Sequence, residues 1–510
     1  MQAKILFSDD LHFHKRNFKS LIEAVETQNY DVEYNQEHKD WMALYGDYAN
    51  KFGSLSGYYN LLERLNKKDL FSYEVRGINV YEVARAELLA YVIPMKELYK
   101  SNLSDDVEEV YGYIYDNCKE ELLLNMSAAL FWLDFWYNKV VVNKKKYTHV
   151  FTFSGSNIYS KALVKVCQST ISRVFVTETS LTGNDYYIEE KNSHLANNSD
   201  IKLLAVKRKH LDALNNDNSP YNTRIKAINK LNLSKNKNVT QPYSELDDIK
   251  FDNENKLVTI LGQVVNDYSV IETKFGYLST VYAYKQLIKE IIEHTDYNVV
   301  FKSHPWEESK TNCEFDITYQ EIIKFVESEI SDSDKERIKV IKDYDIDMLL
   351  KVSEHVVLLN SQSGIEAASH GIKPVILGNA FYSRFGFTSN CRSIKDVLNV
   401  LTTTRGSLTL KEYDNYELFL TLYLEKHLFS VNPSGIKKVI NEIFIPYNKI
   451  QFVTKQKPVK EVTENSKIDM EHSELVEELV ELSAASQIKN GIVYFFTDFE
   501  KFKKKLKNKL

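Results

Sequence analysis

Short apolar runs separated by helix-length segments recur along this chain, and they restrict its fold more than any other feature. Such runs are typical of buried parallel strands, which are joined by crossover helices. In the first half the runs cover 4–8, 30–34, 148–153 and 173–177, with helical patterns over 14–27 and 156–167. In the second half they cover 257–261, 298–302, 339–341, 355–359 and 374–377. The pattern predicts an α/β protein with two doubly wound, Rossmann-like domains.

Length and local composition divide the chain further. At 510 residues, it is longer than one ordinary core accommodates. Residues 214–255 are rich in Asn, Ser, Lys and Asp, which indicates a linker or a mobile loop. We therefore expect an N-terminal Rossmann-like domain with a helical insertion over 1–213, then this linker. A second Rossmann-like domain over 256–445 and a helical tail with a basic end over 446–510 complete the prediction.

The bulk composition argues against several classes of protein. The formal net charge of -6 disfavours a general nucleic-acid binder. The longest apolar stretch, 122–142, is interrupted by polar residues, so a packed helix is expected rather than a membrane span. The N-terminus lacks a signal-peptide pattern. We expect a cytoplasmic protein, or one peripheral to the inner membrane, whose cysteines are buried and reduced: Cys118, Cys167, Cys313 and Cys391.

Polar residues follow several of the apolar runs directly, where the strands end. Ligands of open α/β sheets bind in the crevice beyond these carboxyl ends, so the residues are candidates for one site. Two are carboxylates, which suit a nucleophile or a general acid or base. A Lys-x-His pair and a serine-rich helix start suit a leaving phosphate. The candidates are Glu178, Gln263, Asp267, Lys302, His304, Ser361, Ser363, Gly364 and Glu366.

Each candidate also has an interpretation that needs no ligand. Asp267 follows an Asn, which is typical of an Asx-turn, and His304 precedes a proline, which is common in surface turns. Ser363 and Glu366 have the spacing of a helix capping box. Gly364 lets a ligand approach the backbone closely, and the alternative for this motif is a capped helix without a ligand. The residues gain weight because they recur at successive strand ends.

The order of these segments resembles the capsule polysaccharide synthesis family, the retaining bacterial β-Kdo glycosyltransferases. The similarity is best over 174–388, and it is strongest in LGQVVNDYSV (261–270), VVFKSHP (299–305) and the block 356–388. The resemblance implies a GT-B-like fold, in which two Rossmann-like domains face a central cleft, with C-terminal helices. It implies CMP-β-Kdo as the donor substrate, bound by the second domain, without a cofactor or a metal ion.

The resemblance also implies roles for single residues. Asp267 would be the nucleophile of an aspartyl-glycosyl intermediate, and Glu178 would be the acid/base. The sequence departs from the family pattern after Glu178, where Thr179 and Ser180 replace a segment that contains glycine. The donor site would be lined by Gln263, Lys302, His304, Ser361, Ser363, Gly364 and Glu366.

The candidate residues and the family resemblance leave three functions open. The first is transfer of Kdo to a glycan or glycolipid acceptor in capsule or O-polysaccharide synthesis. The second is transfer of another CMP-activated ulosonic acid, as in sialyltransferases, and the third is a non-catalytic glycan-binding subunit of a polysaccharide export complex. The Asp-x-Asp segments at 332–334 and 345–347 have the form that holds metal-bound sugar diphosphates, but both lie in acidic helical or loop sequence.

Two further groups of charged residues each have one functional and one ordinary structural interpretation. Asp9, Asp10, His12 and His14 follow the first apolar run, where they would face an acceptor or be ordinary loop residues. In 496–510, lysines alternate with Phe and Leu near helical spacing. This pattern predicts either a basic amphipathic helix on the anionic inner-membrane surface or a solvated terminus.

Overall fold

The computed structural model describes residues 3–143, 146–233, 249–273, 276–308 and 315–445. Contacts divide the chain into one compact unit, Met1–Pro446, and a second unit, Tyr447–Leu510. The predicted helical tail over 446–510, with its basic end, lies outside the described residues.

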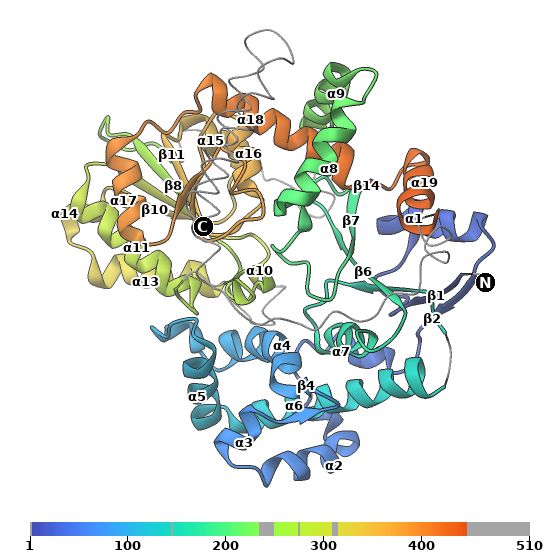
Figure 1. Ribbon diagram of the computed structural model, residues 1–510. Coiled ribbons are helices and arrows are strands. Elements are labelled where there is room, and N and C mark those ends of the chain that lie inside the picture. Colours follow the sequence, from blue (N-terminus) through green and yellow to red (C-terminus); the bar gives the residue numbers. More distant parts are fainter. Residues whose placement is uncertain (1–2, 144–145, 234–248, 274–275, 309–314, 446–510) are drawn as a thin grey trace, which may run out of the picture. The chain divides into compact units, whose positions relative to one another are not determined.

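The first half forms a six-stranded sheet in the order β14-β7-β6-β5-β1-β2 (Figure 1). Strands β2, β1, β5 and β6 are parallel, whereas β7 runs antiparallel to β6 and β14 antiparallel to β7. The strands are β1 (Lys4–Phe7), β2 (Asp31–Tyr34), β5 (His149–Phe153), β6 (Arg173–Thr179), β7 (Asp185–Glu190) and β14 (Phe429–Ser430).

Side chains alternate across this sheet and bury both of its faces, because successive residues of a strand point to opposite sides. Phe7, Phe151 and Phe175 stack in a row on one face, with ring centroids 5.1 Å apart between neighbouring strands. Helices α1 (Lys15–Thr27) and α19 (Pro433–Val439) supply the other side of this core. The opposite face, with Leu6, Val150 and Val176, belongs to the core that contains α7 (Ile158–Cys167).

A helical insertion separates β2 from β5. Its longest helix covers most of the apolar stretch 122–142, and Trp132 and Trp136 are buried in it. The prediction of a packed helix there is confirmed, and no helix of the described residues is long and apolar enough to cross a membrane. The helices are α2 (Phe52–Glu63), α3 (Lys67–Phe71), α4 (Val80–Met95), α5 (Val107–Asn117) and α6 (Lys119–Trp136). Helix α6 continues as a π-helical segment, Tyr137–Val142. The insertion also contains a hairpin of β3 (Glu74–Val75) and β4 (Ile78–Asn79).

The second half forms a six-stranded parallel sheet in the order β10-β9-β8-β11-β12-β13. Numbered by appearance in the chain this order is 3-2-1-4-5-6, the Rossmann order, whose direction reverses between β8 and β11. The strands are β8 (Leu257–Leu261), β9 (Asn298–Lys302), β10 (Ile338–Ile341), β11 (His355–Leu358), β12 (Val375–Leu377) and β13 (Ser389–Cys391).

Helices cover both faces of the second sheet, so its strands read as continuous apolar runs. One core contains Val258, Ile260 and Phe301 together with α11, α13 and α17. The other face packs α15 and α16. The helices of this half are α10 (Tyr268–Ile271), α11 (Thr280–His294), α13 (Ile317–Glu329), α14 (Asp332–Lys335), α15 (Ile346–Val352), α16 (Ser363–Ser369) and α17 (Ile394–Thr403).

Four helical segments connect and follow the two sheets. Helices α8 (Leu204–Asn215) and α9 (Pro220–Leu233) come after β7, and α18 (Leu410–Leu420) continues into the π-helical segment Thr421–His427. Both α8 and α9 pack on that π-helical segment. The chain then returns to the first sheet, because β14 pairs with β7 and α19 packs on α1. The predicted linker 214–255 thus contains α9, and residues 234–248 lie outside the described part.

The predicted fold class is confirmed: both halves are Rossmann-like α/β sheets in one GT-B-like chain. All nine strands expected from the apolar runs are present, and β8 and β9 have the predicted ends. Strands β7, β13 and β14 were not predicted; β13 and β14 are edge strands, and β7 lies between β14 and β6. Cys118, Cys167 and Cys391 are buried free thiols, as predicted, and Cys313 lies outside the described residues.

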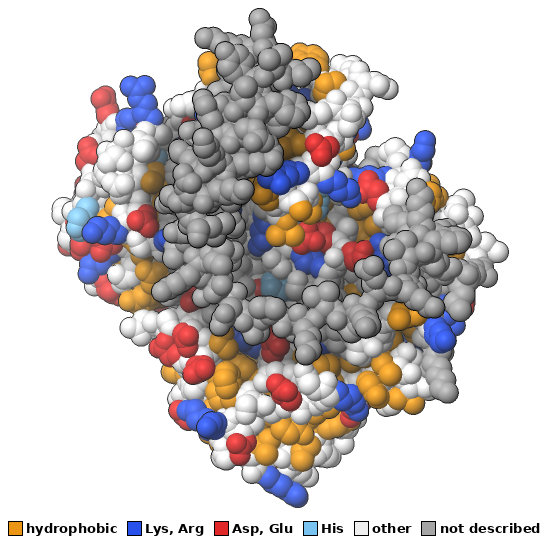
Figure 2. All heavy atoms as spheres, viewed as in Figure 1, with side chains coloured by type: hydrophobic (Ala, Val, Ile, Leu, Met, Phe, Trp, Pro, Cys, Tyr) orange, Lys and Arg blue, Asp and Glu red, His pale blue; other side chains and the backbone are white. Residues whose placement is uncertain are grey.

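Charged side chains of both signs are interspersed over the face seen in Figure 2, outside the residues drawn in grey. A protein that binds nucleic acids through its charge presents a basic stripe or patch. The described part of this face has no such patch.

Candidate functional site

Three loops that carry most of the predicted residues leave adjacent strands of the second sheet. Gln263 and Asp267 follow β8, Lys302 ends β9 with His304 two residues later, and Ser361 follows β11. Because β9, β8 and β11 are parallel neighbours, their carboxyl ends share one edge of the sheet. The reversal of strand order lies between β8 and β11, which is where open α/β sheets bind ligands.

Gln263 joins the two strands that flank this reversal. Its buried side chain accepts a hydrogen bond from the Asn360 N–H at 3.2 Å and donates to the Ser269 hydroxyl at 2.5 Å. The side-chain amide of Asn360 in turn donates to the Ser269 carbonyl at 3.2 Å. A glutamine can accept and donate at once, so this residue fixes the loops after β8 and β11 to each other. In the structure Gln263 therefore holds the site together.

Asp267 is the N-cap of α10. Its carboxylate accepts the Ser269 N–H at 2.8 Å, and its backbone is extended, as at most N-caps. The Asx-turn interpretation is thus correct for one oxygen of the carboxylate. The side chain remains half-buried rather than enclosed, so it keeps access to solvent. A capping aspartate on a very short helix is held rigidly, which a nucleophile also requires.

Lys302 is buried at the end of β9, and its Nζ donates to the Lys342 carbonyl at 3.1 Å. Burial lowers the pKa of this ammonium, and the charges of Asp343, Asp345 and Glu366 partly offset the effect. None of these carboxylates lies within ion-pair distance of Lys302 in the described residues. The sheet edge therefore holds a desolvated cation without a salt bridge, which is suited to an anionic ligand.

His304 lies beyond the strand, because β9 ends at Lys302. The alternation of side chains along a strand therefore does not relate His304 to Lys302. The Trp306 N–H donates to His304 Nδ1 at 3.2 Å, so the neutral imidazole carries its proton on Nε2. The neighbouring Ser303 hydroxyl is buried and has no hydrogen-bond partner among the described residues. Both groups can donate to a phosphate.

The start of α16 differs from the predicted capping box. Gln362 is the N-cap, in a helical conformation and without a side-chain cap bond, and Ser363 is the first helical residue. Ser363 instead bonds the Glu366 carboxyl within the first turn. Burial raises the pKa of Glu366, and the charge of Asp347 adds to the rise. The capping-box prediction is wrong because the chain enters the helix one residue earlier, at Gln362.

Gly364 is required by a tyrosine of the same half. A Cβ at Gly364 would collide with the buried Tyr382 hydroxyl, which donates to the Ser361 carbonyl at 2.5 Å. The glycine therefore lets Tyr382 clamp the loop after β11, and this contact accounts for it without a ligand. Tyr382 lies 18 residues after Gly364 in the chain, so the contact between them becomes visible only in the fold.

Glu178 lies on the first sheet, near the end of β6, where it is opposite Tyr187 of β7. Its carboxylate is half-buried, and one oxygen accepts the Thr179 N–H at 3.2 Å. Glu178 thus belongs to the first sheet, whereas Asp267 follows a strand of the second sheet. The pairing of these two carboxylates stays a prediction.

The Asp-x-Asp segments have local structural roles. Asp345 caps α15 by accepting the Met348 N–H at 3.1 Å, and Asp347 lies 3.0 Å from His370 Nε2. Asp332 pairs with Lys335 on the exposed helix α14. In the described ranges, no group of three or more His, Cys, Asp or Glu side chains is arranged to hold a metal ion.

Two surface hollows lie away from this edge, at the amino ends of the second sheet's strands. One has a volume of about 710 Å³ and is lined by residues that include Tyr297 and Arg337. The other, of about 580 Å³, includes Glu354 and Gly371. Neither is lined by a predicted site residue. Because ligands of these folds bind at the carboxyl ends, we assign neither hollow to the donor.

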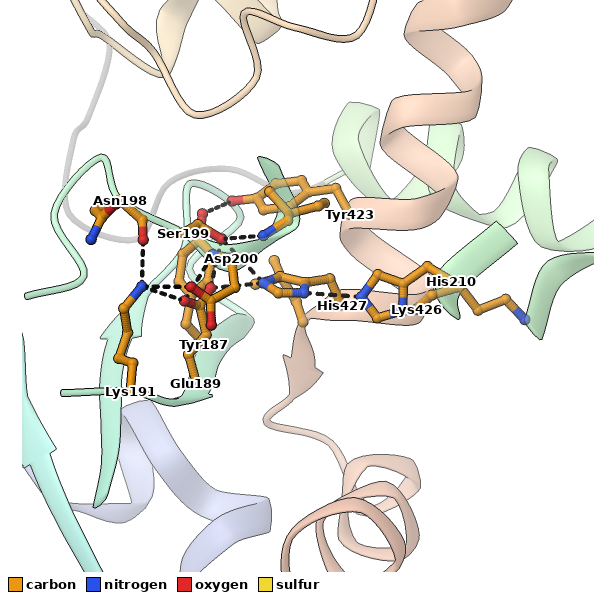
Figure 3. Close-up of polar contacts among 12 residues, drawn as sticks. Tyr187, Glu189, Lys191, Asn198, Ser199, Asp200, His210, Tyr423, Lys426 and His427 are labelled. Atoms are coloured by element: carbon orange, nitrogen blue, oxygen red, sulfur yellow. Dashed lines mark hydrogen bonds and ion pairs between the residues drawn. The ribbon is translucent and has the colours of Figure 1, made fainter. Parts of the chain in front are cut away.

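A buried charged network was missed by the sequence reasoning. Glu189 on β7 accepts hydrogen bonds from Ser199 Oγ at 2.6 Å, His427 Nε2 at 2.8 Å and Lys191 Nζ at 2.9 Å (Figure 3). His427 Nδ1 lies 3.1 Å from Nε2 of His210 on α8. The network ties β7 to α8 and to the π-helical segment 421–427. Its outermost members, Glu189 and His427, are 238 residues apart in the chain, so no local spacing reveals it.

The pKa values of this network favour one charge pattern. Burial raises the pKa of Glu189, but the hydrogen bond and charge of His427 and the charge of Lys191 outweigh it and lower the value to about 2. Burial and the nearby charge of His427 lower the pKa of His210 to about 3. At neutral pH Glu189 is therefore ionised and His210 is a neutral acceptor.

Comparison with known families places the site in context. Residues 197–412 match the family model described as "Capsule polysaccharide biosynthesis protein". We call this matched segment the capsule-synthesis region. The predicted family resemblance is thereby confirmed over this region, which is less than half of the chain. The capsule-synthesis region includes Asp267 and all predicted donor residues, and it excludes Glu178.

Solved structures give weaker likenesses. The β-Kdo 2,4 transferase of Thermosulfurimonas dismutans KpsC is 15% identical, with a TM-score of 0.35, covering 58% of this chain and 87% of that one. The β-Kdo 2,7 transferase of the same protein is 16% identical, with a TM-score of 0.35, covering 61% of this chain and 88% of that one. Staphylococcus aureus MnaA with UDP is 12% identical, with a TM-score of 0.31, covering 90% of this chain and 100% of that one. Such low scores decide nothing about activity, and no curated protein matches the chain significantly.

Proposed function

We propose that this protein is a retaining glycosyltransferase that moves Kdo from CMP-β-Kdo to a glycan or glycolipid acceptor in capsule or O-polysaccharide synthesis. The observation that supports the proposal best is the shared edge of β9, β8 and β11. There, a capping aspartate, a desolvated lysine, a histidine and two serines surround the reversal of strand order. This edge lies within the capsule-synthesis region.

The proposed reaction has two displacements. In the first, the Asp267 carboxylate attacks the anomeric carbon of Kdo, and the bond to CMP breaks with its electron pair leaving on the phosphate. Lys302, His304 and Ser363 donate to this phosphate. In the second, an acceptor hydroxyl attacks the same carbon, its proton passes to a base, and the Asp267 carboxylate is released. Two inversions retain the configuration.

The leaving phosphate explains why protein side chains would stabilise the departing CMP without a metal ion. A monophosphate leaving group carries less charge than a diphosphate, and hydrogen-bond donors with a lysine can stabilise it. Glu178 is the acid/base candidate that the family resemblance suggests. Contact of residues 496–510 with the inner-membrane surface also remains part of the proposal, since lipid-linked acceptors grow there.

A donor screen tests the proposed activity against its closest alternatives. The purified full-length chain is incubated separately with CMP-Kdo and CMP-sialic acid, and CMP release is measured. We expect release from CMP-Kdo. Release from CMP-sialic acid alone would favour a sialyltransferase-like enzyme. Absence of release from either donor, with weak or no CMP binding, would contradict the proposal and favour a non-catalytic glycan-binding subunit.

CMP binding gives the first prediction for single residues. His304→Ala and Ser363→Ala should each weaken CMP binding by about 1–3 kcal/mol, because a hydrogen bond to a charged group is lost. Isothermal titration with CMP measures the change. His370→Ala is a matched control, since His370 caps the opposite end of α16 and contacts Asp347. Equal affinity of all three variants and the wild type would place the donor elsewhere.

A further inference from the structure

The first sheet has its own reversal of strand order, at β1. The strand β1 pairs with β2 on one side and with β5 on the other. The crossover helix α1 joins β1 to β2, and the chain returns to the opposite side for β5, so the order reverses between β1 and β5. Ligands of open sheets bind at such points. The loop Ser8–His12 leaves β1 there, and α7 follows β5.

Asp9 is the buried centre of this loop. One carboxylate oxygen accepts the His12 N–H at 2.7 Å and lies 3.0 Å from His12 Nδ1. The other accepts the Ser8 hydroxyl at 2.8 Å and the Tyr159 hydroxyl at 3.2 Å. Burial raises the pKa of Asp9, but the hydrogen bond and charge of His12 outweigh it and leave the pKa below its usual range. Asp9 is therefore an ionised, fully satisfied anchor.

His12 is held in one orientation by this anchor. Its ring stacks on Phe153 at a centroid distance of 4.4 Å, and Nδ1 faces Asp9. The side chain is 21% exposed, and Nε2 has no hydrogen-bond partner within the described part of the chain. In the neutral ring the proton lies on Nδ1, toward the carboxylate, so Nε2 carries a lone pair. A carboxylate that fixes an imidazole in this way prepares a general base.

Helix α7 connects this pair to the segment that carries Asp267. Tyr159 of α7 donates to Asp9, and two residues later Lys161 makes a buried ion pair of 2.7 Å with Glu272. Glu272 ends α10, and Asp267 begins it. A four-residue helix is only about 6 Å long. The loop after β1 and the segment that carries Asp267 therefore both contact the first turns of α7.

A second set of contacts fixes the same arrangement through α4. The Asn266 amide donates to the Ala90 carbonyl of α4 at 2.9 Å. Glu87 of the same helix accepts the Ile158 N–H at the start of α7 at 2.6 Å. The buried Tyr268 hydroxyl, next to Asp267, has no hydrogen-bond partner in the described residues. This region thus holds polar groups that protein contacts do not satisfy.

We propose that His12, positioned by Asp9, is the base that activates the acceptor hydroxyl in the second displacement. The inference rests on the proposed function and names the proton acceptor of that reaction. The acceptor oxygen forms a bond to the anomeric carbon as the bond to Asp267 breaks, and the hydroxyl proton moves to His12 Nε2. The electron pair of the broken bond returns to the Asp267 carboxylate, and Asp9 stabilises the imidazolium.

This assignment differs from the role given to Glu178 by the family resemblance. Glu178 lies within β6, whose neighbours are β5 and the antiparallel strand β7, so it does not lie at the reversal of strand order. The unprotonated nitrogen of a neutral imidazole can accept a proton from a hydroxyl and later return it. His12 therefore combines the position and the chemistry that a base for a sugar hydroxyl requires.

The test follows the two displacements separately in the full-length protein. Wild type, His12→Ala, Asp9→Asn and Glu178→Gln are mixed with CMP-Kdo. CMP release in the first turnover and the mass of the protein are then followed, in water alone and with a synthetic Kdo-terminated glycolipid. We expect His12→Ala and Asp9→Asn to release the first CMP within about twofold of wild type. Decay of the glycosyl-protein should slow by about 10²–10⁴-fold, so the adduct accumulates.

His14→Ala is the matched control. His14 lies two residues further along the same loop and makes no side-chain cap contact with α1, so its loss should leave adduct decay unchanged. A purely structural role of His12 would slow both displacements or lower the Tm without accumulation of the adduct, and it would overturn the proposal. Accumulation in Glu178→Gln with normal decay in His12→Ala would assign the base to Glu178 instead. If wild type releases no CMP, the proposed function itself fails.

Discussion

Replacing Asp267 by Ala is expected to abolish transfer of Kdo, with a loss of several orders of magnitude in rate, while CMP binding persists. The carboxylate would form the covalent bond to the sugar, so its loss removes the nucleophile of the first displacement. Product formation from CMP-Kdo and CMP affinity are measured on the same preparation. Turnover near the wild-type rate would contradict a double displacement through Asp267.

The cap that Asp267 provides needs its own control. Losing an N-cap costs about 0.5–2 kcal/mol of stability, whatever the residue does in catalysis. Asp106→Ala is a matched variant, since Asp106 caps α5 by accepting the Glu108 and Glu109 N–H groups, each at 3.0 Å. Both variants should lose similar stability. Only Asp267→Ala should lose transfer.

Replacing Glu189 by Ala should cause the largest loss of stability among the variants considered, about 3–5 kcal/mol. The change removes the carboxylate that His427 and Lys191 share and leaves Lys191 paired with Asp200, at 2.9 Å. Removing one partner of a buried ion-pair network is costly. Urea unfolding followed by circular dichroism measures the change. Glu190→Ala is the control on the adjacent residue: Glu190 is exposed and pairs with Arg173, so its loss should cost at most about 1 kcal/mol.

The same network makes stability depend on pH, in a direction that its pKa values fix. His210 has a pKa of about 3 in the folded state, against 6.5 ordinarily, so the unfolded chain binds a proton between these values and the folded chain does not. Glu189, with a pKa of about 2 instead of 4.5, acts likewise at lower pH. The free energy of unfolding should therefore fall as pH decreases below 6.5. His210→Gln should flatten the decrease between pH 6.5 and 5, and an unchanged slope would contradict the assigned charges.

The sequence predicted the strands of both sheets because buried parallel strands are apolar throughout and end at polar residues. The same feature brought Gln263, Lys302 and Ser361 to one edge, since β8, β9 and β11 are neighbours in the Rossmann order. Strand β14 could not be predicted, because two residues, Phe429–Ser430, carry no periodicity and pair only when the chain returns to β7.

Other features depended on contacts between distant residues. The spacing of Ser363 and Glu366 predicted a capping box, but Gln362 begins the helix turn, and the pair instead bonds within the helix. Glycine at 364 suggested a ligand, whereas Tyr382 fills that space. Asp9 and His12 could be placed after a strand from the sequence. Their hydrogen bond to each other and to Tyr159, 147 residues further on, could not.

The most direct test of a double displacement is the intact mass of the wild-type protein after brief incubation with CMP-Kdo in the absence of acceptor. The account predicts an increase by one Kdo residue, carried on the peptide that contains Asp267, and release of one CMP for each adduct formed. It also predicts no adduct on Asp267→Ala. CMP release and transfer by wild type without any adduct, together with an active Asp267→Ala variant, would contradict the central claim.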